Sequence, residues 1–340
     1  MTDVFHSILA LLAERKNLTR DVTMRAFQII MNGGATPAQM AAFLMGLRCK
    51  GESVEEITAA AMVMRAKALR IKAPAGCIDT CGTGGDAKGT YNISTASAFV
   101  VASCGVPVAK HGNRAISSQA GSADVLQMLG VKVDADVPVL ERCFEKCNIA
   151  FLLAPKFHPA TRHVAPVRQE LGIRTLFNLL GPLSNPAAPA FQMMGVFSKH
   201  WVEPLAHVLK ELGTQAAWVV HGSDGLDELT LTGPTIVAEL KGGSVRLFEI
   251  SPEEAGLERA SLEELKGGSA EANATALLNA LSGMESAYRR AVLYNAAAAL
   301  LVAGKVADMK SGVEMAKDAI DSGRAHSLVK KLVEVSNERP

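Results

Sequence analysis

Asp79-Thr80-Cys81-Gly82-Thr83-Gly84-Gly85-Asp86 opens the most informative stretch of this 340-residue chain. Three further polar segments belong to it: Asn92-Ile93-Ser94-Thr95, Lys110-His111-Gly112-Asn113-Arg114-Ala115-Ile116-Ser117-Ser118 and Gly121-Ser122-Ala123-Asp124. Between Asp86 and Asp124 there is no acidic residue, whereas Lys88, Lys110 and Arg114 are positive and many Ser, Thr, Asn and Gly residues supply neutral donors. This composition predicts a site for an anion.

The glycines and the helix that follows them would supply main-chain donors. Gly82, Gly84 and Gly85 allow backbone conformations that other residues avoid, and they bring bare N–H groups close to a ligand. The apolar run over 93–101 predicts a helix that is entered through Asn92. Its first N–H groups and the positive end of its dipole would face a phosphate.

Two familiar glycine motifs do not explain the stretch. Residues 82–87 fit the dinucleotide pattern, but that fold needs an acidic residue about 20 positions further on to hold a ribose hydroxyl. This interval contains none, and the next strand-like run, 106–109, leads into Lys110 and His111. The Walker pattern fails as well, because Lys88 precedes Gly89 instead of following it.

The motifs resemble those of the anthranilate phosphoribosyltransferase family, whose members join anthranilate to phosphoribosyl pyrophosphate (PRPP) in tryptophan biosynthesis. The likeness rests on Gly-Thr-Gly-Gly-Asp, Asn-Ile-Ser-Thr and Lys-His-Gly-Asn-Arg-Ala-x-Ser-Ser, and it extends from the N-terminal helices to the end of the chain. It implies an enzyme that forms N-(5-phosphoribosyl)anthranilate and pyrophosphate, the second step of tryptophan synthesis from chorismate. It also implies a set of PRPP-binding residues: Gly82, Thr83, Gly84, Gly85, Asp86, Thr90, Asn92, Ile93, Ser94, Thr95, Lys110, His111, Gly112, Asn113, Arg114, Ala115, Ile116, Ser117, Ser118 and Ser122.

A second polar region, residues 154–186, supplies candidates for the anthranilate side. The planar fork of an arginine matches a carboxylate with two hydrogen bonds, and the resemblance places Arg168 against the anthranilate carboxylate. His158 suits a pocket wall, although a neutral, packed histidine explains it equally well. For Arg174 we expect an ion pair with Glu170, four residues earlier. The anthranilate-binding residues that the resemblance implies are Gly82, His111, Asn113, His158 and Arg168.

A third region, residues 221–228, carries the adjacent acids Asp227 and Glu228 directly after a strand-like run. Two carboxylates about 4 Å apart repel by roughly 4 kcal/mol at an effective dielectric near 20. A divalent cation bound between them turns this repulsion into a net attraction. Hard oxygen ligands and a diphosphate together favour magnesium. The resemblance places Asp227, Glu228 and Ser94 on Mg²⁺, with two ions per subunit. Asp224 is expected to form the turn.

The pattern of the whole chain predicts an α/β protein of two domains. Residues 1–72 predict a small all-helical domain of four helices, which helices from about 160–182 would join, and residues 73–340 predict a large α/β domain. Its short strands are predicted at 77–80, 106–109, 150–154, 216–221, 236–240 and 245–250. The sheet should be mostly parallel, with an antiparallel hairpin formed by the last two strands. The resemblance implies a nucleoside phosphorylase/phosphoribosyltransferase-like fold.

Composition limits the partners and the location. The net charge of +1 gives no overall field for nucleic acid or membranes. The N-terminus lacks a signal-peptide pattern and no apolar run is long enough to cross a bilayer, so we expect a cytoplasmic protein. The six cysteines do not form paired zinc motifs and are expected to be free thiols. The resemblance implies a homodimer through the helical domain and leaves an association with anthranilate synthase open.

Two other functions remain as alternatives. Pyrimidine nucleoside phosphorylases share this general architecture and also break a ribosyl bond, but they would use phosphate and need no carboxylate pair for magnesium. A relative that binds nucleic acid and has lost the reaction should show a basic groove and damaged motifs. No Ser-His-Asp or Cys-His signature occurs, and transfer to a neutral aromatic amine requires no strong base. Positioning and electrostatic stabilisation of the leaving pyrophosphate would therefore supply the rate.

Overall fold

The N-terminal part of the chain forms the four helices that the sequence predicts. The computed structural model describes residues 2–115 and 119–339. Its first helices are α1 (Thr2–Ala13), α2 (Arg20–Met31), α3 (Pro37–Lys50) and α4 (Val54–Lys67). Thr36 and Ser53 begin α3 and α4 with complete capping boxes, in which the side chain of Gln39 or Glu56 returns a bond to the cap backbone. The first residues of these two helices could therefore be predicted from their capping residues alone.

A seven-stranded sheet forms the centre of the rest of the chain. Its strands are β1 (Ile78–Gly82), β2 (Val108–Gly112), β3 (Ile149–Leu153), β4 (Phe191–Gly195), β5 (Ala216–Gly222), β6 (Thr235–Lys241) and β7 (Ser244–Ile250). The order is β3-β2-β1-β4-β5-β6-β7, with β1 to β5 parallel and β6 and β7 antiparallel. The mostly parallel sheet and the hairpin are confirmed.

The strand β4, which lies between β1 and β5 at the middle of the sheet, was not predicted from the sequence. Its five residues follow a segment rich in proline and alanine, and Gln192 interrupts the apolar run. In the fold Gln192 is fully buried because its amide donates to the Pro182 carbonyl at 2.6 Å. A tertiary partner therefore satisfies the amide nitrogen of the polar side chain that had made this segment look unlike a strand.

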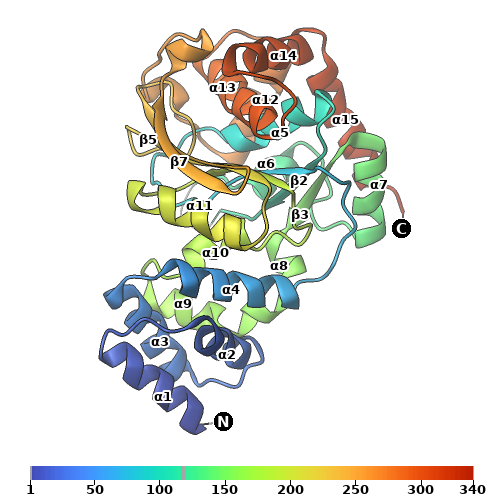
Figure 1. The fold of residues 1–340 in the computed structure, drawn as a ribbon. Coiled ribbons are helices and arrows are strands. Elements are labelled where there is room, and N and C mark those ends of the chain that lie inside the picture. The colour runs from blue at the N-terminus through green and yellow to red at the C-terminus, as the bar shows by residue number, and fades with distance from the viewer. Residues whose placement is uncertain (1, 116–118, 340) are drawn as a thin grey trace.

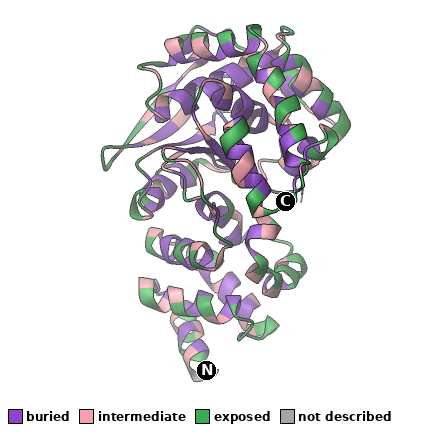
Figure 2. Cartoon of the chain, turned by 90° about the vertical axis from the view of Figure 1, so that its right-hand side faces the viewer, coloured by how far each residue is buried: buried purple, intermediate pink, exposed green. Residues whose placement is uncertain are grey.

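Helices cover both faces of the sheet (Figure 1). One face carries helices from the middle and the end of the chain: α5 (Ile93–Ser103), α6 (Ser122–Met128), α7 (Val137–Cys147), α12 (Ala270–Leu281), α13 (Ala287–Val302), α14 (Met309–Asp321) and α15 (Arg324–Ser336). The other face carries α11 (Val202–Glu211), which packs on β5 and β6. Figure 2 shows buried residues in the helices against the sheet and exposed residues on the outer helix faces.

The helical part is joined to the sheet by a continuous apolar core. Three short helices lie between them: α8 (Ala154–Phe157), α9 (Ala165–Leu171) and α10 (Phe177–Leu183). The α9 helix packs on α3, and α10 packs on α4. One core cluster runs from Phe27 and Phe43 through Leu180 to Met194 and Val219 on the sheet. In the described part of the chain, no helix combines the length and the apolar character needed to cross a membrane.

Four neighbouring parallel strands, β1, β2, β4 and β5, each end in a glycine at the same edge of the sheet. These glycines are Gly82, Gly112, Gly195 and Gly222. A Cβ at each would collide with atoms of a neighbouring segment; at Gly82, for example, it would lie 2.6 Å from Asp227 Oδ2. The glycines thus let the loops after the strands lie directly on the strand ends, where ligands of parallel sheets bind.

Gly195→Ala tests this packing, because the backbone carbonyl of Asp227 occupies the place of the new Cβ. We expect a loss of at least about 1–3 kcal/mol in stability, as overpacking displaces the loop or the strand. The measurement is the midpoint of thermal unfolding. Gly268→Ala is the matched control, since its Cβ would meet Ala272 at an ordinary 3.6 Å. Unfolding of Gly195→Ala at the wild-type temperature would contradict the packing.

Candidate functional site

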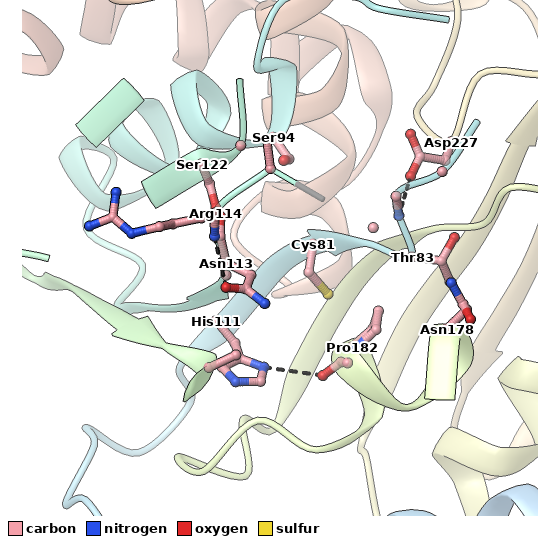
Figure 3. A pocket seen from close by; sticks show the side chains of 18 of the residues that line it. Cys81, Thr83, Ser94, His111, Asn113, Arg114, Ser122, Asn178, Pro182 and Asp227 are labelled. Carbon is pink, nitrogen blue, oxygen red and sulfur yellow. Dashed lines mark hydrogen bonds between the residues drawn. The ribbon is translucent and has the colours of Figure 1, made fainter. Parts of the chain in front are cut away.

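A cavity of about 460 Å³ lies at the glycine edge of the sheet. It extends from the glycine loop, defined here as residues 82–86, to the helices α8 to α10. Figure 3 shows the part between Thr83 of this loop and Asn178 and Pro182 of α10. All of the predicted site residues that the structure describes line this one cavity. Ile116, Ser117 and Ser118, which were also predicted, lie outside the described residues. Segments up to about 150 residues apart in sequence are thus brought to one place, including the glycine loop and Glu228.

The glycine loop is bonded to the sheet on one side and to an acid on the other. Thr83 N donates to the Gly195 carbonyl at 2.9 Å, and Gly84 N donates to Asp227 Oδ2 at 2.9 Å. In Figure 3 Asp227 projects towards this part of the loop. Gly84 and Gly85 have φ values of +64° and +76°, in the left-handed region that favours glycine. The loop conformation therefore depends on glycine at both positions.

The N-terminus of α5 faces the second acid. Ser94 N donates to Glu228 Oε1 at 3.1 Å, so a carboxylate interacts with the positive end of this helix. The side chain of Asn92 does not cap α5. It donates instead to the Ala120 carbonyl and accepts from Asn273, and so connects the loop before α6 to α12. Asn92 organises the cavity wall through these bonds.

Two buried groups of opposite charge, Lys110 and Asp79, lie beneath the cavity. Lys110 is 3% exposed, and its ammonium donates to the Thr80 carbonyl at 2.6 Å and to Ser94 Oγ at 3.3 Å. Burial lowers the pKa of Lys110, while the nearby carboxylate of Asp79 opposes that shift. Asp79 is fully buried and accepts from His111 N and from the Asn185 amide at 2.8 Å. Burial raises the pKa of Asp79 to about 6.

Three acids, Asp86, Asp227 and Glu228, approach one another at the wall of the cavity. Burial first, and the neighbouring acid second, raise the pKa of Asp227 to about 7 and that of Glu228 to about 8. Asp86 Oδ2 is buried and has no hydrogen-bond partner among the described residues. Over those same residues, no group of three His, Cys, Asp or Glu side chains is arranged as a complete metal site. The acids suit a hard cation that takes its remaining oxygens from a ligand and water.

Two histidines form the wall opposite the acids. The rings of His111 and His158 lie 5.2 Å apart in an edge-to-face arrangement. Burial lowers the pKa of His111 to about 3 and that of His158 to about 4, so both are neutral at physiological pH. His111 Nδ1 donates to the Gly181 carbonyl at 3.1 Å, because a carbonyl only accepts. His111 Nε2 then carries a lone pair, and it has no partner within the described chain.

Arg168 approaches the cavity from α9. Its guanidinium lies over the Phe177 ring, 5.1 Å from the centroid, and burial lowers its pKa. No carboxylate of the described residues forms an ion pair with it. A half-buried cation without a protein counter-charge is suited to an anionic ligand.

Part of the cavity wall was not assigned from the sequence. It comes mainly from α10 and consists of Phe177, Asn178, Leu180, Gly181, Pro182 and Ser184. The Asn-Leu-Leu-Gly-Pro run had stood out, but apolar residues at helical spacing do not distinguish a pocket wall from an ordinary core. The position of a main-chain group such as the Gly181 carbonyl cannot be predicted from residue types, because every residue has a carbonyl.

Two expectations about charged residues had different outcomes. The predicted ion pair between Arg174 and Glu170 is wrong: Arg174 Nη2 donates to the Gly85 carbonyl instead. Asp224 forms the expected turn, with Oδ1 accepting from Leu226 N at 3.1 Å and Oδ2 accepting from the Thr230 hydroxyl at 2.7 Å. For Arg174, the contact with the glycine loop is therefore preferred over an exposed ion pair with Glu170.

The fold and the site define a glycosyl transferase. Residues 6–68 match the helical bundle domain of the glycosyl transferase family, and residues 75–326 match its a/b domain. An anthranilate phosphoribosyltransferase from Azospirillum brasilense is 58% identical over 337 residues, covering 99% of this chain and 94% of that protein. The chain belongs to the anthranilate phosphoribosyltransferase family.

Solved structures agree with this assignment. The anthranilate phosphoribosyltransferase from Thermus thermophilus superposes with a TM-score of 0.92 at 42% identity, covering 97% of this chain and 99% of that one. The enzyme from Saccharomyces cerevisiae in complex with PRPP and Mg has a TM-score of 0.90 at 26% identity, covering 99% and 98%. The predicted family and fold class are confirmed.

The acid pair makes a testable contribution to stability. The raised pKa values mean that the folded protein keeps protons which the unfolded chain releases near pH 4. In the absence of metal, this pair therefore lowers stability as the pH rises from about 4 to about 8. In D227N/E228Q the unfolding midpoint should fall less over this range than in the wild type. Addition of Mg²⁺ at pH 8 should raise the wild-type midpoint and leave that of D227N/E228Q unchanged.

The matched control for this experiment is E145Q/E258Q, which removes two exposed carboxylates. It should retain both the pH dependence and the Mg²⁺ response of the wild type. A magnesium titration of D227N/E228Q that matches the wild type would remove these acids from the metal site.

Proposed function

We infer that the protein transfers the phosphoribosyl group of PRPP to the amine of anthranilate. The products are N-(5-phosphoribosyl)anthranilate and pyrophosphate, and the reaction is the second step of tryptophan synthesis from chorismate. One observation carries this conclusion: the glycine loop, the N-terminus of α5, the acid pair and Arg168 all open onto one cavity. A single ligand can therefore reach the main-chain donors and the acids together.

PRPP is proposed to lie across the floor of the cavity. The main-chain N–H groups of 82–86, the first turn of α5 and the polar segment around Asn113 to Ala115 would hold its phosphates. The proposed metal ligands are Asp227, Glu228 and Ser94, with two Mg²⁺ ions per subunit; the Ser94 hydroxyl already lies near the Lys110 ammonium. Magnesium bound there would neutralise negative charge on the departing pyrophosphate. Lys110 adds fixed positive charge from below, and such charge requires no rearrangement during the reaction.

Anthranilate is proposed to lie between Arg168 and the histidine pair. Arg168 would hold its carboxylate, and the Phe177 ring supports the guanidinium from one side. The lone pair of His111 Nε2 can accept an N–H of the amine, which would aim the nitrogen at the ribose. With a pKa of about 3, His111 is a weak base. The aromatic amine is uncharged at neutral pH, so orientation is the main contribution required of this wall.

The subunit organisation is also proposed. The helices at 160–182 would complete the helical domain of residues 1–72, leaving the α/β domain to carry the glycine loop. The packing of α9 on α3 and of α10 on α4 supports this division. The family resemblance supports a homodimer through the helical domain, where Met45 and Met62 are exposed.

The test of the activity is the loss of anthranilate fluorescence in the presence of PRPP and Mg²⁺. Consumption should require all three components and release pyrophosphate in equal amount. Phosphate-dependent cleavage of a pyrimidine nucleoside, with no consumption of anthranilate, would favour the phosphorylase alternative instead.

Arg168→Ala should raise the KM for anthranilate by about 10- to 100-fold, because a charged, two-pronged hydrogen bond contributes roughly 1.5–3 kcal/mol. The KM for PRPP should change far less. The control is Arg162→Ala, which removes the same charge from an exposed position outside the cavity wall. Equal increases in both KM values for Arg168→Ala would count against the assignment.

A further inference from the structure

Arg174 lies outside the cavity wall, yet it is bonded to the glycine loop. Its Nη2 donates to the Gly85 carbonyl, and its guanidinium lies over the Phe197 ring, 4.4 Å from the centroid. A Cβ built on Gly85 would lie 3.8 Å from Arg174 Nε, so the guanidinium packs against the loop and does not merely reach it. Arg174 is itself exposed to solvent.

Phe197 is bonded to the same loop from the other direction. Its backbone N–H donates to Thr83 Oγ1 at 3.0 Å, and Thr83 N donates to the Gly195 carbonyl at 2.9 Å. Thr83, Phe197, Arg174 and Gly85 therefore form a closed ring of contacts. This ring, which we call the loop clamp, ties the glycine loop to the end of β4 and to the segment between α9 and α10.

The loop clamp also determines the direction of a main-chain donor. In a trans peptide the carbonyl of one residue and the N–H of the next point in opposite directions. With the Gly85 carbonyl held by Arg174, the Asp86 N–H points away from Arg174. Asp86 and Gly85 line the cavity and Arg174 does not. Among the described residues, no hydrogen-bond acceptor for this N–H is found. We infer that this N–H is available to a ligand in the cavity.

The loop would not hold this arrangement by itself. Gly84 and Gly85 both have positive φ, and glycine loses more conformational freedom on ordering than any other residue. Apart from the loop clamp, the tip of the loop is held by the bond from Gly84 N to Asp227. Asp227 is a proposed metal ligand, so a shift of this carboxylate towards a cation would also move its bond to Gly84 N. The loop clamp stays available when Asp227 is engaged elsewhere.

We propose that Arg174 is a positioning residue that orders the glycine loop for the pyrophosphate of PRPP, acting through the Gly85 carbonyl and the Phe197 ring. The inference rests on the proposed function of the cavity and adds to it a residue outside the cavity wall. Arg174 does not touch the substrate. It reduces the ordering that PRPP binding would otherwise require.

The test compares Arg174→Ala, Arg174→Lys and Phe197→Leu with the wild type. Arg174→Ala should raise both the KM and the calorimetric Kd for PRPP with Mg²⁺ by about tenfold, since a hydrogen bond and an exposed cation–π contact are lost together. The kcat and the anthranilate KM should stay within about threefold, and the unfolding midpoint should not change. Arg174→Lys should be intermediate, because lysine donates a bond but cannot stack as a plane.

Coupling between the two partners gives a second readout. Phe197→Leu should weaken PRPP binding in the same direction, and the double variant R174A/F197L should bind PRPP no more weakly than Arg174→Ala alone. Glu170→Gln is the matched control, because it removes an exposed charge four residues from Arg174. It should match the wild type in every parameter.

Two results would overturn the proposal. One is a PRPP Kd of Arg174→Ala within twofold of the wild type. The other is an equal rise in both KM values together with a lower unfolding midpoint, which would mean a general structural role. If the wild type formed no phosphoribosyl anthranilate, the proposed function would fail, while the calorimetric comparison with PRPP would still decide on the loop clamp.

Discussion

Repulsion among buried carboxyl groups is the constraint on which the rest of this site depends. Asp227 and Glu228 are adjacent in sequence, Asp86 adjoins them, and Glu228 is only 9% exposed. Each like-charge pair about 4 Å apart opposes assembly by roughly 4 kcal/mol at an effective dielectric near 20. The raised pKa values of Asp227 and Glu228 are the response of the ligand-free protein. In the proposed complex, a polyphosphate that arrives with divalent cations would remove this repulsion and would be bound for the same reason.

The surrounding structure holds these acids in place and limits the alternatives. Gly82 and Gly195 allow the Asp227 loop to lie directly on the ends of β1 and β4. Gly84 N and Ser94 N each donate to one acid, so main-chain groups orient both carboxylates. Lys110, which donates to the Thr80 carbonyl and to Ser94 Oγ, places a positive charge beneath them. The acids therefore cannot separate without breaking contacts in the sheet, in α5 and in the glycine loop.

Much of this could be predicted from the sequence because the signals are local. Helix caps such as Ser53, the hairpin around 241–244 and the glycine motif each act over a few residues, and the structure confirms the helices and the hairpin. The β4 strand could not be identified because Gln192 interrupts its apolar pattern. The carbonyl that accepts from the Gln192 amide belongs to α10 and is recognisable only in the fold. Arg174 was misassigned for a related reason: Glu170 is its neighbour in sequence, whereas Gly85 is its neighbour in space. The contribution of α10 to the cavity wall was not predicted, because residues that line a pocket and residues of an ordinary core show the same apolar pattern.

The central claim is that PRPP is bound by main-chain amides on one side and by a cation on paired acids on the other. Calorimetric titration of the wild-type protein with PRPP, once in Mg²⁺ and once in EDTA, tests it most directly. The affinity for PRPP should fall by at least tenfold in EDTA, because the unneutralised pyrophosphate would then face the carboxylates. Equal affinity with and without the metal would contradict it.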